Sequence, residues 1–516
     1  MAHSLPFLPN EILLRILEML GCRDILACHA TCSRMRVLIT DSIALQYSIE
    51  LSACGMIDGR QDPHTLPIQE RLDRIRRYTA AWETLLWTSR LALPHLVGLE
   101  SPISVSGDVF LLPPSVVGAI ADSVTGVQVQ QIPSELRAIK EDHQIHSIPV
   151  LALTGNGKIR LDAAQELIVF RERNFIGGQT VTRTHVHSLL TGEAHPLAFA
   201  HGVMETMDPG LAFEDMCGDL LLEAIASDVG GICTPIVRNW KTGLVEAKGT
   251  VMIKHRYMAF LDKQHIISVT GGTYLALYPT CLQVTSLVSV DTTPTLAESR
   301  SYSFALPEFL QHKLLHIHTQ ISNLEHIPPP HGCFYPDPAD RLISVAINSS
   351  GKRFVIDIPV RTFKTYISSH PGGAAAIIPW DAWGTHGARM VHVSPFDTGR
   401  WTLSGSRRMT FRRALEPDGP NMLTLLDYSP RRVARAVARG TATVLHGAEV
   451  GTVYTGPECG PLRTLLPCIV TEVPLPDIMG EWGEGVESAW LCENGVLFLK
   501  CDAVSHRILD ACAYTI

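Results

Sequence analysis

Charged side chains are scarce in this chain of 516 residues: they make up 18% of it, against 46% hydrophobic residues. This scarcity excludes a disordered adaptor and is typical of a folded chain with a large core. An excess of basic residues is missing too, because the formal net charge is −8. That balance argues against binding to nucleic acid or to an anionic membrane through bulk electrostatics.

Cysteine pairs at metal-ligand spacing are also absent, since the 13 cysteines include no Cys-x-x-Cys. The first residues, MAHSLPFLPNE, contain a proline break and lack the apolar region of a secretory signal. We therefore expect reduced cysteines and a location in the cytoplasm, the nucleus or both. The uncharged stretch 264–290 contains Thr270-Gly271-Gly272 and Pro279, which predicts paired strands across a glycine turn rather than a membrane span.

The compact motifs of catalysis do not occur: there is no G-x-S-x-G, H-E-x-x-H, P-loop or G-x-G-x-x-G. His312, His316 and His318 could offer metal ligands, but polar positions near a strand start explain them better. His185 and His187 alternate on one strand face and are expected to lie on a sheet surface. We expect no catalytic residue, no cofactor and no metal.

What the chain does have is a helical N-terminal stretch from Leu8 to Leu45. Its apolar residues recur at helical spacing after Pro9, with Gly21 as the expected end of the first helix. A second helix is predicted over Ile25 to Cys32 with Asp24 as its cap, and a third after Ser33. Three short helices bury too little apolar surface to fold alone, so we expect them to bind another protein or to cap a larger domain.

The residues of this stretch resemble a known family. LPNEILLRILEML, the subsequent Asp-Ile-Leu, CSRMR and Asp41 resemble the F-box, which docks on the Skp adaptor of Skp–cullin–F-box ubiquitin ligases. Met35 stands where that family often has tryptophan. The resemblance implies an adaptor-binding surface made by Leu8, Pro9, Ile12, Leu13, Ile16, Leu17, Leu20, Leu26, Cys32 and Met35.

A connecting segment comes after the helical stretch. Residues 46–66 mix Ser, Gly, Asp and Pro and are expected to form a linker or a short helix with a loop. From Pro67 the sequence PIQERLDRIRRYTAAWETLLW has helical spacing, with Trp82 and Trp87 placed to pack on the next domain. We interpret Arg71, Arg74, Arg76 and Arg77 as a mostly solvated helix face rather than a nucleic-acid site.

After about residue 95 the helical period gives way to short apolar runs separated by Gly, Asp, Asn and Pro, which predicts an all-β region. Two strand starts, at Gln165 and Cys217, and the two turns Thr191-Gly192 and Thr242-Gly243 recur at a period near fifty residues. That period fits a propeller blade of four antiparallel strands. We predict about seven blades, with six or eight as alternatives and a β-sandwich pair as the competing fold.

The predicted organisation is therefore α+β: an F-box helical module at 1–50, a linker and connecting helix at 51–95, and a β-propeller at 96–516. The segments NWKTG, PWDAWGTHGARMV, LLDYSP and VPLPD are similar to those of F-box proteins with a WD-repeat-like propeller, numerous in mushroom-forming fungi. We also predict that the ring closes by pairing residues near 103–112 with residues near 490–510.

The strongest charge clusters are candidates for substrate contact. Arg407 and Arg408, and Arg431, Arg432 and Arg435 on a short amphipathic helix, could capture an acidic or phosphorylated segment, although a salt-bridged surface is the simpler interpretation. The family resemblance implies a substrate adaptor that binds the Skp adaptor, through it a cullin, and an unknown substrate protein. A scaffold that works outside a ligase, and a propeller enzyme or small-ligand binder with a helical cap, are the alternatives.

Overall fold

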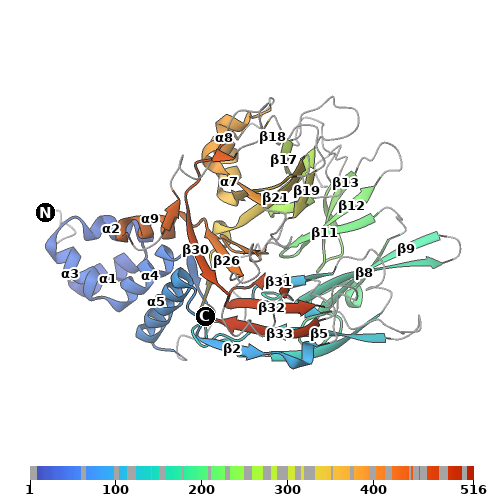
Figure 1. Ribbon diagram of the computed structural model, residues 1–516, viewed down its shortest axis with the longest axis horizontal. Helices are drawn as coiled ribbons and strands as arrows, with labels where there is room; N and C mark the ends of the chain where they lie inside the picture. Colours follow the sequence, from blue (N-terminus) through green and yellow to red (C-terminus); the bar gives the residue numbers. More distant parts are fainter. Residues whose placement is uncertain are drawn as a thin grey trace.

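The computed structural model describes 8–59, 66–97, 104–112, 124–140, 142–149, 159–176, 179–206, 211–226, 233–248, 258–270, 281–287, 300–307, 315–318, 332–349, 352–371, 377–393, 402–412, 421–440, 443–445, 452–453, 462–475, 486–501 and 508–516. Figure 1 shows the helical N-terminal part at one end of the molecule and the strands β8 and β9 at the other.

Four helices form the N-terminal module: α1 (Asn10–Glu18), α2 (Cys22–His29), α3 (Ser33–Asp41) and α4 (Ile43–Ala53). The second helix begins before the predicted position, because Gly21 has an extended backbone and its carbonyl accepts the N–H groups of Asp24 and Ile25. Gly21 is thus a start signal rather than the stop that was predicted. The fourth helix occupies much of the expected linker, and Leu45 belongs to it.

The connecting helix is α5 (Ile68–Thr84), which ends at Leu85 in a left-handed conformation. Its buried face carries Leu72, Ile75, Tyr78 and Trp82, which pack in one apolar cluster with residues of both the helical module and the last two sheets. This shared core fixes α5 on both parts of the chain, because separating them would expose the cluster to water.

The arginines of α5 divide between the two sides of the helix. Arg76 and Arg77 are exposed, as predicted, and half-buried Arg74 pairs with Glu70 at 2.7 Å. Arg71, by contrast, is buried: it forms an ion pair with Asp58, just after α4, and its guanidinium lies 5.1 Å from the centroid of the Tyr47 ring. Its place on the solvated face was predicted wrongly, because its partners come from the helical module.

The described strands after α5 form seven antiparallel blades around a ring (Figure 1). Blade 1 contains β3 (Ser104–Ser106), β4 (Val109–Leu112), β5 (Val124–Gln131) and β6 (Asp142–Pro149); blade 2 contains β7 (Arg160–Asp162), β8 (Leu167–Ile176), β9 (Gln179–Ser188) and β10 (Val203–Thr206). Blade 3 contains β11 (Leu211–Cys217), β12 (Leu220–Ala226), β13 (Cys233–Asn239) and β14 (Val245–Lys248); blade 4 contains β15 (Met258–Asp262), β16 (His265–Thr270), β17 (Cys281–Ser286) and β18 (Ser301–Ala305).

The remaining blades carry insertions. Blade 5 contains β19 (Leu315–His318), β21 (Leu342–Ser349), β22 (Lys352–Pro359) and β23 (Arg389–Val393), with α7 (Val360–Ser369) and α8 (Trp380–Gly387) before its last strand. Blade 6 contains β24 (Thr402–Ser404), β25 (Arg407–Arg412), β26 (Met422–Asp427) and β30 (Cys468–Pro474), extended by β27 (Thr443–Leu445), with α9 (Pro430–Arg439) directly after β26. Two short ribbons pair β28 (Thr452–Val453) with β29 (Leu462–Arg463), and β1 (Met56–Asp58) with β20 (Phe334–Pro336).

Blade 7 shows how the ring closes. It contains β31 (Val486–Leu491), β32 (Gly495–Cys501), β33 (Ile508–Thr515) and, on its outer edge, β2 (Ser89–Ala92) from directly after α5. Closure by a strand from the start of the propeller was predicted, but the residues were wrong. The stretch 104–112 forms β3 and β4 of blade 1, and the fully buried β4 is unsuited to an outer edge, whereas β2 is mostly exposed.

The predicted seven-blade propeller is confirmed, and the sandwich alternative is wrong. The faint sequence repeat corresponds to blades 2 and 3, where Gly192 and Gly243 both have positive φ in the turn that precedes the fourth strand. The two strands predicted within 264–290 are β16 and β17, paired from Thr270 to Cys281; the glycines between them lie outside the described residues.

Candidate functional site

An exposed apolar stripe runs along α1. Ile12 and Met19 are 48% and 86% exposed, half-buried Ile16 lies between them, and Leu26 on α2 is also 48% exposed. Positions 12, 16 and 19 share one helix face, so these side chains form a continuous surface. Exposed apolar surface of this kind is typical of a protein-binding site.

Three of the ten predicted adaptor contacts are buried instead in the module's own core: Leu13, Leu17 and Met35. They pack with Ile25 and Ile39, so they shape the exposed surface without being part of it. Of the others, Pro9, Ile12, Leu26 and Cys32 are exposed, and Leu8, Ile16 and Leu20 are half-buried. Met19, which is not among the ten predicted contacts, is highly exposed at the C-terminal cap of the same helix.

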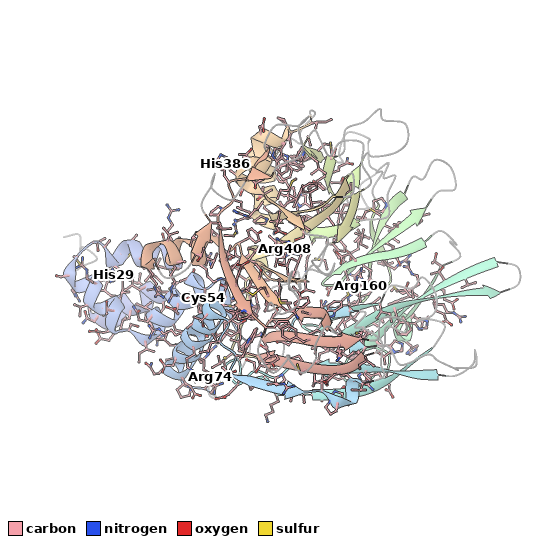
Figure 2. All side chains as sticks on the ribbon, viewed as in Figure 1. His29, Cys54, Arg74, Arg160, His386 and Arg408 are labelled. Carbon is pink, nitrogen blue, oxygen red and sulfur yellow. The ribbon has the colours of Figure 1, made fainter. Side chains whose placement is uncertain are left out.

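Helix α9 clamps the helical module to blade 6 (Figure 1), and Figure 2 labels Cys54 at this contact. Arg432 pairs with Asp427 at the end of β26 through Nε at 2.6 Å and Nη2 at 2.9 Å, and its Nη1 donates to the carbonyl oxygen of Cys54. Arg431 donates to the carbonyl oxygen of Ser52, and Arg435 forms an ion pair with Glu50 of α4. Three successive contacts thus join the end of α4 to the propeller.

Residues 5–51 match the family model described as F-box-like. The helical module is an F-box-like domain. No curated protein matches the chain closely enough to count as a relative.

Among solved structures, the chain is similar to the WD40 domain of SCAP from fission yeast, with 8% identity, 83% of this chain and 98% of that chain covered, and a TM-score of 0.32. It is also similar to the β-propeller domain of the Trilobed protease from Pyrococcus furiosus, with 10% identity, coverage of 67% and 88%, and a TM-score of 0.23. The propeller fold of this chain is established by its own strand pairing.

The blade 6 arginines predicted to contact a substrate are engaged within the protein. Arg408 is buried and pairs with buried Asp357 at 2.8 Å, and Tyr428 donates to the same carboxylate. Arg407 is buried between Asp427, at 3.3 Å, and the Trp82 ring, 4.4 Å from its centroid. A buried guanidinium that already has its carboxylate partner is not accessible to a ligand.

The clamp arginines are likewise occupied. Arg432 is buried, and Arg435 is half-buried against Glu50. Arg431 is exposed, and one of its guanidinium nitrogens donates a hydrogen bond to the Ser52 carbonyl oxygen. Buried Arg407, Arg408 and Arg432 are therefore not available to a substrate in this structure, whereas substrate contact by Arg431 and Arg435 stays a prediction. The predicted amphipathic helix exists, and Arg432 and Arg435 face blade 6 and the F-box-like domain.

A network of buried polar side chains lies where the ring closes. The buried guanidinium of Arg137, in the turn after β5, contacts Asp108 at 2.7 Å, Asn494 at 2.8 Å, Glu493 at 3.0 Å and the carbonyl oxygen of Phe334 at 2.9 Å. It therefore joins blade 1, blade 7 and β20 in one network. No period or motif marks Arg137, so sequence reasoning missed it.

His185 and His187, two of the histidines singled out from the sequence, have partners within blade 2. The His185 ring stacks on Phe170 at 4.7 Å and bonds to Glu172, while His187 Nδ1 contacts the carbonyl oxygen of Gly192. His316 and His318 belong to β19, and His312 lies outside the described residues. Within the described ranges, no cluster of three or more His, Cys, Asp or Glu is arranged to hold a metal. No described helix has the length and apolarity needed to cross a bilayer.

The clamp predicts a specific pH dependence. Although burial opposes it, the charges of Arg432 and Arg407 lower the pKa of Asp427 from 3.8 to about 2. A carboxyl whose pKa is lower in the folded state stabilises the fold above its unfolded pKa, and loses this contribution as the pH falls through its folded pKa. The difference between the folded and unfolded pKa values of Asp427 corresponds to about 2 kcal/mol in the free energy of unfolding.

We expect the difference in free energy of unfolding between the wild type and Asp427→Asn to shrink by about 2 kcal/mol from about pH 5 to about pH 2. Urea unfolding at a series of pH values measures it. The variant is the matched reference, because every other carboxyl titrates equally in both proteins. A difference independent of pH would show that Asp427 has no lowered pKa.

Proposed function

We propose that this chain is the substrate-recognition adaptor of a Skp–cullin–F-box ubiquitin ligase. Its F-box-like domain docks on the Skp adaptor through the exposed stripe, and its propeller binds the substrate protein. The observation that carries the proposal is the combination of an exposed apolar surface on the F-box-like domain with a rigid attachment to a propeller. The proposed location is the cytoplasm, the nucleus or both.

This chain has no bond-making step in the proposed mechanism. A ubiquitin-conjugating enzyme recruited through the cullin transfers ubiquitin, and this chain raises the local concentration of substrate lysines beside it. Positioning of this kind needs a fixed geometry between the two binding surfaces. The clamp of α9 and the shared core of α5 supply that geometry.

The test is co-purification of the intact chain with a Skp adaptor, beside the double variant Ile12→Asp, Leu26→Asp. Both side chains are about half exposed, so the variant is expected to fold. Two unpaired carboxylates buried at the interface cost several kcal/mol, so we expect the variant to lose the adaptor.

The matched control is Leu509→Asp, a leucine of similar exposure on blade 7, which is expected to keep the adaptor. If the wild type fails to bind, or if the double variant binds as tightly as the control, the proposal fails. Co-purification of the Skp adaptor without a cullin would instead favour a scaffold that works outside a ligase.

A further inference from the structure

Three large apolar side chains form an exposed patch on the connections between the third and fourth strands of blades 2 and 3. Leu197, Phe199 and Leu244 are 59%, 49% and 67% exposed, and we call them the turn patch. The two connections are neighbours in space, because the Phe199 ring lies against Gly243: a Cβ built there would lie 2.4 Å from a ring carbon. Large exposed apolar groups that cluster in this way are typical of a binding surface.

The backbone that carries the patch is held in place by hydrogen bonds. The Phe199 N–H donates to the carbonyl oxygen of Trp240 at 3.1 Å, and the Leu197 N–H donates to Nδ1 of His195 at 3.2 Å. The His195 ring stands edge-on against the buried Trp240 ring at 4.9 Å. A patch fixed in advance loses little conformational entropy on binding, which favours its use as a docking surface.

The backbone directly after Phe199 is strained. Ala200 and His201 have φ of 48° and 56°, a left-handed conformation that is unfavourable for residues other than glycine. Strain of this kind persists where the surrounding contacts enforce it, and it concentrates at functional sites.

The charges around the patch are predominantly negative. Lys241 is paired with Asp219 at 2.6 Å, and Arg183 with Glu205 at 2.6 Å, so these cations are neutralised. Exposed Glu193 follows Gly192, and exposed Glu246 lies in β14, where it accepts a hydrogen bond from Asn239 at 2.6 Å. Neither takes part in an ion pair among the described residues. The patch therefore combines an apolar centre with a negative rim.

We propose that the turn patch binds a short segment of the substrate in which large apolar residues are flanked by lysine or arginine. This inference rests on the proposed function, since it names the chemistry that the propeller would recognise. The apolar residues of the bound segment cover Leu197, Phe199 and Leu244, and its basic residues form ion pairs with Glu193 and Glu246. In a propeller, equivalent connections lie on one face, so the patch is on the face that also carries α9.

The test uses the full chain and a fluorescein-labelled peptide in which two leucines and a phenylalanine alternate with lysines. Two matched peptides carry glutamate for each lysine, or serine for each apolar residue. Fluorescence anisotropy should show that the first peptide binds at least about tenfold more tightly than either matched peptide. The double variant Leu197→Ser, Leu244→Ser should weaken its binding about tenfold, and Glu193→Lys, Glu246→Lys several-fold at low salt.

The control variant Ile377→Ser, at another half-exposed apolar position, should bind the peptide as the wild type does. Equal binding of all three peptides, or full binding by the double variant, overturns the inference. So does a wild-type dimer that this variant converts to a monomer, because a second copy would then cover the patch. Co-purification with the Skp adaptor, measured on the same proteins, reports separately on the proposed function and should be unchanged in every variant.

Discussion

Arg432→Ala is expected to lower the free energy of unfolding by about 3 to 5 kcal/mol, because it leaves the buried Asp427 carboxylate without its main partner. The substitution also removes the donor to the Cys54 carbonyl, and with it one of the three contacts between α9 and the end of α4. Urea unfolding measures the loss. Arg432→Lys should recover only part of it, because an ammonium group cannot reproduce the fork that reaches Asp427 and Ser406 together.

The control for this prediction is Arg439→Ala, an exposed arginine at the end of the same helix, which should change the free energy of unfolding by less than about 0.5 kcal/mol. The Arg432→Ala variant is also expected to have a functional effect. Under the proposed function, Arg432→Ala should retain the Skp adaptor but transfer ubiquitin to its substrate more slowly, because the two surfaces no longer hold a fixed distance. Equal stability of the Arg432 and Arg439 variants would rule out a clamp at this position.

Arg137→Met should be similarly destabilising, by about 3 to 5 kcal/mol, since it leaves Asp108 and Glu493 facing each other in a buried site. Burial, and the nearby charge of Glu493, already raise the pKa of Asp108 to about 7 despite Arg137. A carboxyl whose pKa is raised on folding stabilises the fold below its unfolded pKa, and that contribution disappears as the pH rises through the folded value.

Loss of the cation raises the pKa of Asp108 further, so the cost of Arg137→Met should be larger at about pH 8 than at about pH 5. Urea unfolding at both pH values, with Arg76→Met as an exposed control on α5, measures this difference. A cost that is the same at both pH values would mean that the two carboxylates do not depend on Arg137.

The sequence was most informative where a period or a motif repeats. Helical spacing of apolar residues predicted α1 and α5, and the recurring Thr-Gly turns predicted blades, because positive φ at Gly192 and Gly243 is a local requirement. The F-box resemblance found the right module, but it could not separate exposed Ile12 from buried Leu13. Both are apolar neighbours on one helix, and only the packing of α3 and α4 decides which faces solvent.

The arginines show why the rest could not be predicted. Arg432 and Arg431 are adjacent and chemically identical, yet one is buried in ion pairs and the other is exposed. Their partners, Asp427 and the carbonyl groups of Ser52 and Cys54, come together only when blade 6 meets α4. Closure by β2 was missed for the same reason: pairing of Ser89 with Thr515 spans nearly the whole chain and leaves no local signal.

That long-range pairing also orders events during synthesis. The F-box-like domain and α5 leave the ribosome before the propeller, and α1 to α4 have their own core, so the surface proposed to bind the Skp adaptor is available early. The ring, in contrast, cannot close until β33 has been made and has met β2. A nascent or truncated chain without residues 508–515 would present the F-box-like domain while carrying an open propeller, with the unpaired edges of β2 and β32 exposed to aggregation or to quality control.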